Sequence, residues 1–165
     1  LAQAEFTFAV AKAAKEEGIS VVTETSGFGK AEDILALVPF CDLFLFDCKA
    51  SSADHKALIG VADDLILNNL AALCKAQATV ILRCPVVEGA NVNEEFIQKI
   101  VALSKSAESV QKIQLMPYHA TGIEKSDIIG KVPQKRFETP SVASLHRLSK
   151  KIELSSGKHC FFEKH

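Results

Sequence analysis

The hydrophobic positions of this chain alternate between helix-like and strand-like spacing along its whole length. Apolar residues at i, i+3, i+4 and i+7 predict a first helix that Gly18 ends, and they are Phe6, Ala9, Val10 and Ala13. Helical spacing recurs at 31–37, 66–73, 97–101 and 142–152. Short apolar or β-branched runs between these helices predict strands at 19–25, 43–46, 79–87, 110–116 and 159–163.

Individual residues sharpen several of these boundaries. Gly60 interrupts the helical stretch that precedes 66–73, and Asn93 is placed to cap the helix after it. Thr139 followed by Pro140 predicts the N-cap and first residue of the last helix, after a polar loop at 120–138. The run at 43–46 is apolar at every position, which is typical of a strand buried on both faces.

Strands separated by helices predict an α/β fold of parallel βα units joined by right-handed crossovers. No linker or low-complexity segment divides the chain, so we expect residues 1–165 to form a single domain. In folds of this class ligands bind beyond the carboxyl ends of the strands. The polar residues at those ends are therefore the candidates for chemistry.

Composition excludes several classes of protein. With 48% hydrophobic and 24% charged residues the chain is not intrinsically disordered, and a net charge of −1 gives no case for nucleic acid or an anionic membrane. Five widely spaced cysteines without a CxxC pair favour free thiols in a reducing compartment, so we expect a cytoplasmic protein. We expect His55, His146, His159 and His165 to lie on the surface.

Two charged residues follow the apolar run at 43–46. Asp47 and Lys49 are two positions apart, so their side chains share a face if the strand continues that far. An ammonium and a carboxylate at a strand end suit a zwitterionic ligand. An exposed ion pair that contributes little is an equally good interpretation of the pattern.

Arg83 and His119 complete the candidates. Arg83 interrupts an apolar strand, and its permanent charge requires a carboxylate or phosphate of a ligand, or an internal ion pair with Glu24 or Asp47. His119 follows a strand and is either a polar ligand contact or an ordinary loop residue. Gly27 and Gly29 do not form a phosphate loop, because the third glycine of GxGxxG is missing.

Five segments, taken in order, resemble the glycyl-radical-enzyme activating branch of the radical S-adenosylmethionine family, which includes the pyruvate formate-lyase activators. They are TETSGF at 23–28, CDLFLFDCK at 41–49, HKALIGV at 55–61, ILRCPVVEG at 81–89 and QLMPYHATG at 114–122. The resemblance covers residues 1 to about 130, and the tail matches loosely.

The resemblance implies a partial barrel of six βα units, in which a CxxxCxxC loop after the first strand holds a [4Fe-4S] cluster. The segment LAQAEF at 1–6 resembles the residues directly after the family's GGEP motif, which ends the second strand. We therefore expect strands three to six of the barrel here, with βα units at 1–130 and a loop, helix and tail at 131–165. Because the cluster ligands are missing from this chain, we expect it to be inactive by itself.

Site residues are implied position by position. Asp47, Cys48 and Lys49 match a DxK motif that contacts S-adenosylmethionine, with Lys49 suited to its carboxylate. His119 matches a histidine that reaches the nucleoside part of this cofactor, and Arg83 matches a strand arginine near cofactor and substrate.

A monovalent-cation site is implied as well. Thr25 and Asp47, with the carbonyl of Leu45, resemble ligands of a cation beside the cofactor. Glu24 departs from the pattern, because the pyruvate formate-lyase activators have Asp at this position.

The implied reaction is reductive cleavage of S-adenosylmethionine, which installs a glycyl radical on pyruvate formate-lyase or a related enzyme, with flavodoxin or ferredoxin as reductant.

If a preceding strand is absent, the strand at 19–25 is an apolar edge of the sheet. We then expect the chain to self-associate through this edge, or its final strand to cover it. Two alternatives are an aldolase-like barrel fragment with Lys49 as Schiff base, and a non-enzymatic flavodoxin-like module.

Overall fold

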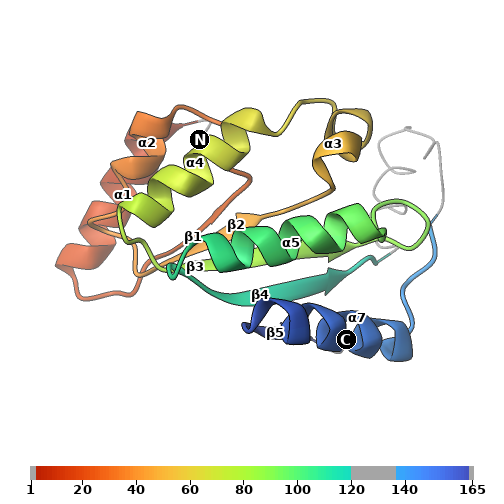
Figure 1. Cartoon of the computed structure of the whole chain (residues 1–165). Coiled ribbons are helices and arrows are strands. Elements are labelled where there is room, and N and C mark those ends of the chain that lie inside the picture. Colours follow the sequence, from red (N-terminus) through yellow and green to blue (C-terminus); the bar gives the residue numbers. More distant parts are fainter. Residues whose placement is uncertain (1–2, 120–136, 164–165) are drawn as a thin grey trace, which may run out of the picture.

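A single parallel sheet organises the computed structural model, which describes residues 3–119 and 137–163. Within these residues the strands lie in the order in which they occur along the chain (Figure 1). They are β1 (Val22–Thr25), β2 (Leu43–Asp47), β3 (Val80–Val86), β4 (Val110–Pro117) and β5 (His159–Phe162). Each parallel neighbour is reached through at least one helix, so the predicted α/β fold of βα units is confirmed.

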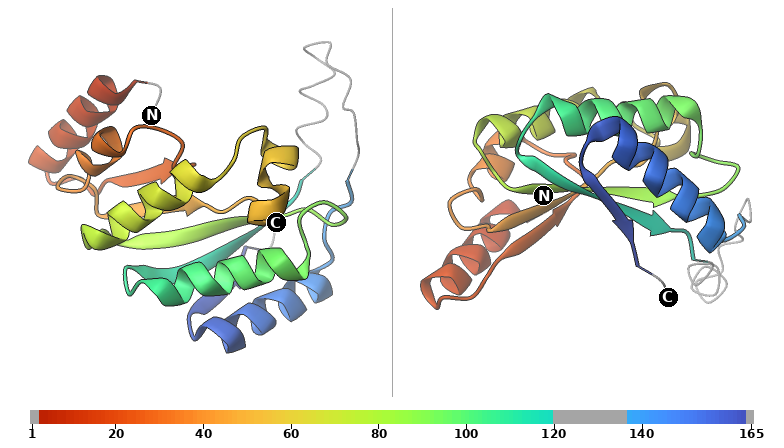
Figure 2. Two further views of the ribbon diagram at one scale, coloured as in Figure 1. Left: turned by 45° about the horizontal axis from the view of Figure 1, so that its top comes forward. Right: turned by 60° about the horizontal axis from the view of Figure 1, so that its bottom comes forward.

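The helices lie together on one face of the curved sheet (Figure 2). They are α1 (Ala4–Glu16), α2 (Ala31–Leu35), α3 (Ser52–Ile59), α4 (Asp64–Lys75), α5 (Glu94–Ser106) and α7 (Val142–Ser156). Gly60 adopts a left-handed conformation after α3, so the predicted interruption near it is confirmed. Asn93 caps α5 as predicted, because its side chain accepts the N–H of Phe96.

Strand alternation gives the sheet one buried face and one half-exposed face. In β3, Val80, Leu82, Cys84 and Val86 are at most 2% exposed beneath the helices, whereas the residues between them are only partly buried. β2 alternates in the same way, so the prediction that 43–46 is buried on both faces is wrong. Its second face is apolar in sequence, but no helix of the described residues covers it.

Two predicted boundaries are corrected, and a third cannot be compared. The first strand begins at Val22, because the N–H of Ile19 still bonds the carbonyl of Ala14 in α1 and the N–H of Val21 donates to the side chain of Asp42. The N-cap of α7 is Ser141, whose side chain accepts the N–H of Ser144, so the prediction of Thr139 as the cap is wrong. The predicted loop at 120–138 lies outside the described residues except for its last two positions.

Two expectations about exposure and edges are also corrected. His55 is 3% exposed rather than on the surface, because Nδ1 hydrogen-bonds the carbonyl of Val61 at 2.8 Å across the α3–α4 turn. The final strand β5 pairs with β4, at the far end of the sheet from β1. It therefore does not cover the β1 edge, and that alternative is wrong.

No single helix among residues 3–119 and 137–163 has both the length and the hydropathy to cross a bilayer. The helices α3 and α4 reach that length and hydropathy only when joined, and they are bent by 117° at their junction.

Candidate functional site

Four charged side chains meet at the carboxyl ends of β1, β2 and β3, on the face of the sheet that the helices leave uncovered. Asp47 is paired in register with Arg83, and Glu24 lies one strand away. Arg83 Nη1 forms an ion pair with Glu24 Oε1, and Lys49 Nζ lies 3.4 Å from Asp47 Oδ2. We call these residues the charged row: Glu24, Arg83, Asp47 and Lys49.

Arg83 has donor capacity that the described residues do not use. Its side chain is 13% exposed, yet Nε and Nη1 are buried without a hydrogen-bond partner in the part of the chain that the structure describes. Glu24 supplies charge close to Nη1, as the internal ion-pair interpretation expected, but not hydrogen-bond geometry. Since a buried guanidinium is costly without full hydrogen bonding, this arrangement suits an additional anionic group.

Asp47 lies between two cations. Burial raises the pKa of its carboxyl, whereas Lys49 and Arg83 act in the opposite direction and only partly offset the rise. The carboxyl is 16% exposed and Lys49 is 34% exposed, so the pair lies between solvent and core. A carboxylate and an ammonium in this setting can hold the two charges of a zwitterion.

The side chains of Thr25 and Cys48 are not part of the charged row. Thr25 is in register with Phe46, on the face that the helices cover, and its hydroxyl accepts the N–H of Gly27 at 3.0 Å. Cys48 is 5% exposed and lies in the core with Cys84, and burial raises the pKa of the Cys84 thiol strongly. On the uncovered face of the sheet, beside Asp47, Thr25 and Cys48 can therefore contact a ligand only through main-chain atoms.

His119 lies two residues beyond the end of β4 and shares a cavity with Arg83. The cavity has a volume of about 150 Å³, and its other polar lining residues are Gln114 and Glu163. The structure thus joins two candidates that the sequence could place only at separate strand ends.

Lys49 lines a second cavity. It measures about 270 Å³ and is lined mainly by apolar groups, including Pro85, Val87 and Tyr118. The rule that ligands bind at strand ends picks out Tyr118, which follows β4 directly, but it does not pick out Asn91, which also lines this cavity. Asn91 lies in the segment after β3 and carries no such signal in the sequence.

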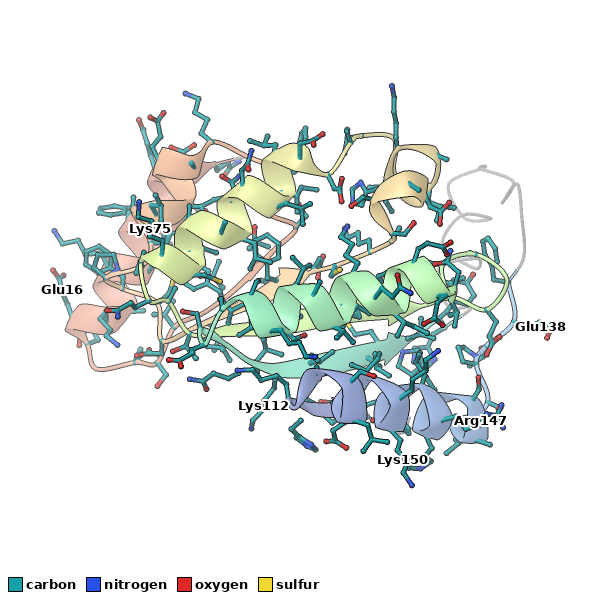
Figure 3. All side chains as sticks on the ribbon, in the orientation of Figure 1. Glu16, Lys75, Lys112, Glu138, Arg147 and Lys150 are labelled. Atoms are coloured by element: carbon teal, nitrogen blue, oxygen red, sulfur yellow. The ribbon has the colours of Figure 1, made fainter. Side chains whose placement is uncertain are left out.

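Four exposed charged side chains on the helices line neither of these two cavities. They are Glu16, Lys75, Arg147 and Lys150, which are exposed on α1, α4 and α7 (Figure 3). Within residues 3–119 and 137–163, no group of three or more His, Cys, Asp or Glu side chains is arranged to hold a metal ion. The free thiols of Cys41, Cys48, Cys74, Cys84 and Cys160 therefore do not fit a [4Fe-4S] cluster.

Comparison with known proteins identifies homologues of the chain. The chain is 31% identical over 156 residues to trans-4-hydroxy-L-proline dehydratase activating enzyme from Clostridioides difficile, covering 92% of this chain and 51% of that protein. It is 34% identical over 134 residues to choline trimethylamine-lyase activating enzyme from Oleidesulfovibrio alaskensis, covering 79% of this chain and 43% of that protein. The chain is a homologue of the glycyl-radical-enzyme activating enzymes.

The fold comparison agrees with the sequence comparison. A solved domain of pyruvate formate-lyase-activating enzyme from Bacteroides vulgatus superposes with a TM-score of 0.79 at 23% identity, over 98% of this chain and 92% of that domain. No family model matches the sequence. This activating-enzyme homologue spans about half the length of the curated relatives it matches, so the activity of a whole protein is a matter for proposal.

Proposed function

We propose that this activating-enzyme homologue forms the cofactor-positioning part of an enzyme that reductively cleaves S-adenosylmethionine to install a glycyl radical on a partner enzyme. The observation that carries the proposal is the charged row at the carboxyl ends of the strands, with its buried, incompletely bonded Arg83. A rigid sheet edge with an ammonium, a carboxylate and spare guanidinium donors suits a zwitterionic cofactor.

S-adenosylmethionine, when bound beside a reduced [4Fe-4S] cluster, supplies the radical chemistry, and the protein binds and orients it. In the proposed site Lys49 binds the cofactor carboxylate and Asp47 balances the charge of Lys49. Arg83 and His119 line the neighbouring cavity and orient groups that enter it. The thiols of this chain do not fit the cluster, so we assign the cluster ligands to residues outside it.

The monovalent-cation site is part of the same proposal in a narrower form. Asp47 offers a carboxylate, and the main-chain carbonyl of Leu45 belongs to the same strand. Thr25 would have to use its main-chain oxygen, because its hydroxyl is bonded to Gly27. Glu24 already faces Arg83, which leaves it less free to act as a further ligand.

The wider assignments rest on the family. The proposed partner is a glycyl radical enzyme such as pyruvate formate-lyase, which the names of the relatives support in kind. Flavodoxin or ferredoxin is the proposed reductant, and the cytoplasm is the proposed compartment. Within the chain, residues 1–130 are the proposed βα part and residues 131–165 its C-terminal tail. We also propose that the 165-residue chain self-associates through β1.

Binding of S-adenosylmethionine to the chain tests the proposal. We expect isothermal titration to detect binding and Lys49→Met to raise the dissociation constant at least about tenfold, because a charge-assisted hydrogen bond is lost. Lys75→Met is the matched control, since Lys75 is exposed at the end of α4 and lines neither cavity of the proposed site. Unchanged affinity in Lys49→Met would contradict the role given to this lysine.

A further inference from the structure

The main chain of Lys49 lies at the point where the hydrogen-bond ladder between β2 and β3 ends. The final ladder bond runs from the N–H of Cys48 to the carbonyl of Arg83, at 2.8 Å. The carbonyl of Lys49, one residue further on, instead accepts a hydrogen bond from Asn91 Nδ2 at 2.8 Å. A side chain has therefore replaced the neighbouring strand as the partner of this residue.

Asn91 is 4% exposed and its amide is bonded at both ends. Nδ2 donates a second hydrogen bond to the carbonyl of Pro85 at 2.7 Å, and Oδ1 accepts the N–H of Val87 at 2.9 Å. Two carbonyls face the nitrogen and one N–H faces the oxygen, so only one orientation of the amide satisfies all three groups. This amide links the segment after β2 to the segment after β3.

We propose that Asn91 is a positioning residue for Lys49: its amide fixes the Lys49 main chain to the end of β3, which keeps the ammonium beside Asp47 and directed at a ligand carboxylate. The inference rests on the proposed function for the ligand, but the link between Asn91 and Lys49 stands on the structure alone. The Asn91 amide is bonded to the main chain of Lys49, Pro85 and Val87, so we assign its effect to the placement of Lys49.

A second asparagine nearby provides a matched control. Asn93 Nδ2 donates to Asp54 Oδ2 at 2.8 Å. Asp54 is in α3, five residues beyond Lys49, so this bond joins the start of α3 to the start of α5. Loss of either asparagine removes hydrogen bonds between the same two segments of chain. Only loss of Asn91 releases the carbonyl of Lys49 itself.

The ligand experiment compares S-adenosylmethionine with methylthioadenosine, which keeps the nucleoside and lacks the carboxylate. We expect Asn91→Ala and the equal-volume variant Asn91→Asp to raise the dissociation constant of S-adenosylmethionine about tenfold and that of methylthioadenosine less than about twofold. Asn93→Ala should change neither constant by more than about twofold. In a Lys49→Met background, Asn91→Ala should have no further effect, since the two residues act as one unit.

The possible results separate the inference from the function on which it rests. If Lys49→Met weakens S-adenosylmethionine binding but Asn91→Ala does not, the positioning role is wrong and the function survives. If Asn91→Ala raises the dissociation constants of both ligands equally, Asn91 is merely structural and the inference is overturned. If the unaltered chain binds neither ligand, or Lys49→Met has no effect, the proposed function itself fails.

A measurement without ligand tests the link directly. Lys49, Arg83 and Glu24 are the charged groups that face Asp47, and Lys49 holds the pKa of Asp47 below the value that burial alone would give. Carbon-detected NMR titration of Asp47 should therefore show a higher pKa in Lys49→Met, and a rise in the same direction in Asn91→Ala. The Asn93→Ala control should titrate like the unaltered chain, and an unchanged Asp47 in Asn91→Ala would overturn the inference.

Discussion

Gly27 is held in a left-handed conformation against the ring of Phe46, in the turn that follows β1. Its φ is +72°, and a Cβ added there would overlap the Phe46 ring, which is 1% exposed and cannot move aside freely. Asn69 Nδ2, from α4, donates to the carbonyls of Gly27 and Gly29 at 2.7 and 2.8 Å. The turn beside Thr25 is thus fixed from both sides.

Gly27→Ala should lower the free energy of unfolding by about 3 kcal/mol, because left-handed strain adds to a core clash. Gly89→Ala is the control: Gly89 has the same φ of +72° but no atom within 4 Å of an added Cβ, so we expect a loss of about 1 kcal/mol. Urea denaturation of both variants measures the difference. Equal losses would show that contact with Phe46 contributes nothing.

Sequence reasoning reaches part of this arrangement and then stops for a physical reason. The glycines at 27 and 29 predict a turn, since glycine accepts a positive φ without cost. The partners of that turn are distant in sequence, because Asn69 is 42 residues from Gly27. Asn91 escapes prediction in the same way, being 42 residues from Lys49.

At the scale of elements, a buried ion pair joins α5 to the segment that connects α3 with α4. Lys99 Nζ lies 2.5 Å from Asp63 Oδ2 and donates to the carbonyl of Ala50 at 2.9 Å, while the Ser52 hydroxyl donates to the same carboxylate at 2.6 Å. The side chains of Lys99 and Asp63 are only 12% and 7% exposed. Every charge is therefore paired, as burial requires.

Lys99→Met should lower the free energy of unfolding at neutral pH by about 3 kcal/mol, because it leaves the Asp63 carboxylate buried without its cation. The stability of the unaltered chain should also depend on pH through this pair. Burial raises the pKa of Asp63, but hydrogen bonds from Lys99 and Ser52 outweigh burial and leave the pKa lowered.

The direction of the pH dependence is set by the lowered pKa. The unfolded chain takes up a proton on Asp63 near pH 3.9 and the folded chain only at lower pH, so the stabilisation exists above that pH and is lost below it. The free energy of unfolding, measured by urea denaturation, should therefore fall less steeply between pH 6 and pH 3 in Asp63→Asn than in the unaltered chain. Parallel pH profiles in the two proteins would contradict this account of the pair.

The elements themselves follow from sequence pattern better than their contacts do. Period-two alternation in β3 and apolar stripes on α4 and α5 arise from local geometry, and local geometry is encoded locally. The burial of His55 depends on the α3–α4 turn folding back to offer the carbonyl of Val61. Such a contact exists only after the elements pack, so the sequence pattern alone favours a surface position for His55.

At the scale of the whole molecule, the two ends of the sheet differ. β5 closes one end beneath α7, where Cys160 is buried and the Ser149 hydroxyl donates to its carbonyl at 2.5 Å. β1 has one neighbouring strand, β2, among the described residues, and a groove of about 520 Å³ runs between its other side and α1. The groove is lined by the exposed apolar residues Phe6, Val10 and Val22.

The order of the sheet was within reach of the sequence, whereas the state of its β1 edge was not. Consecutive strands of a βα barrel lie side by side, so the resemblance to a partial barrel implies the observed order β1 to β5. Whether the last strand returned to cover β1 depended on packing at both ends of the sheet. The structure places it beside β4, which leaves a partner of the β1 edge to be identified by experiment.

Self-association through β1 gives the prediction at this scale. An edge strand with free main-chain groups and apolar neighbours is a template for pairing, so the 165-residue chain should sediment as a dimer or larger species at about 50 µM. Val22→Lys should shift it to monomer, because a charge on the edge strand must be desolvated when two edges pair. Leu154→Lys is the control, since Leu154 is 78% exposed on α7, at the β5 end of the sheet. A monomer in the unaltered chain, or an equal shift in both variants, would rule out β1 as the contact.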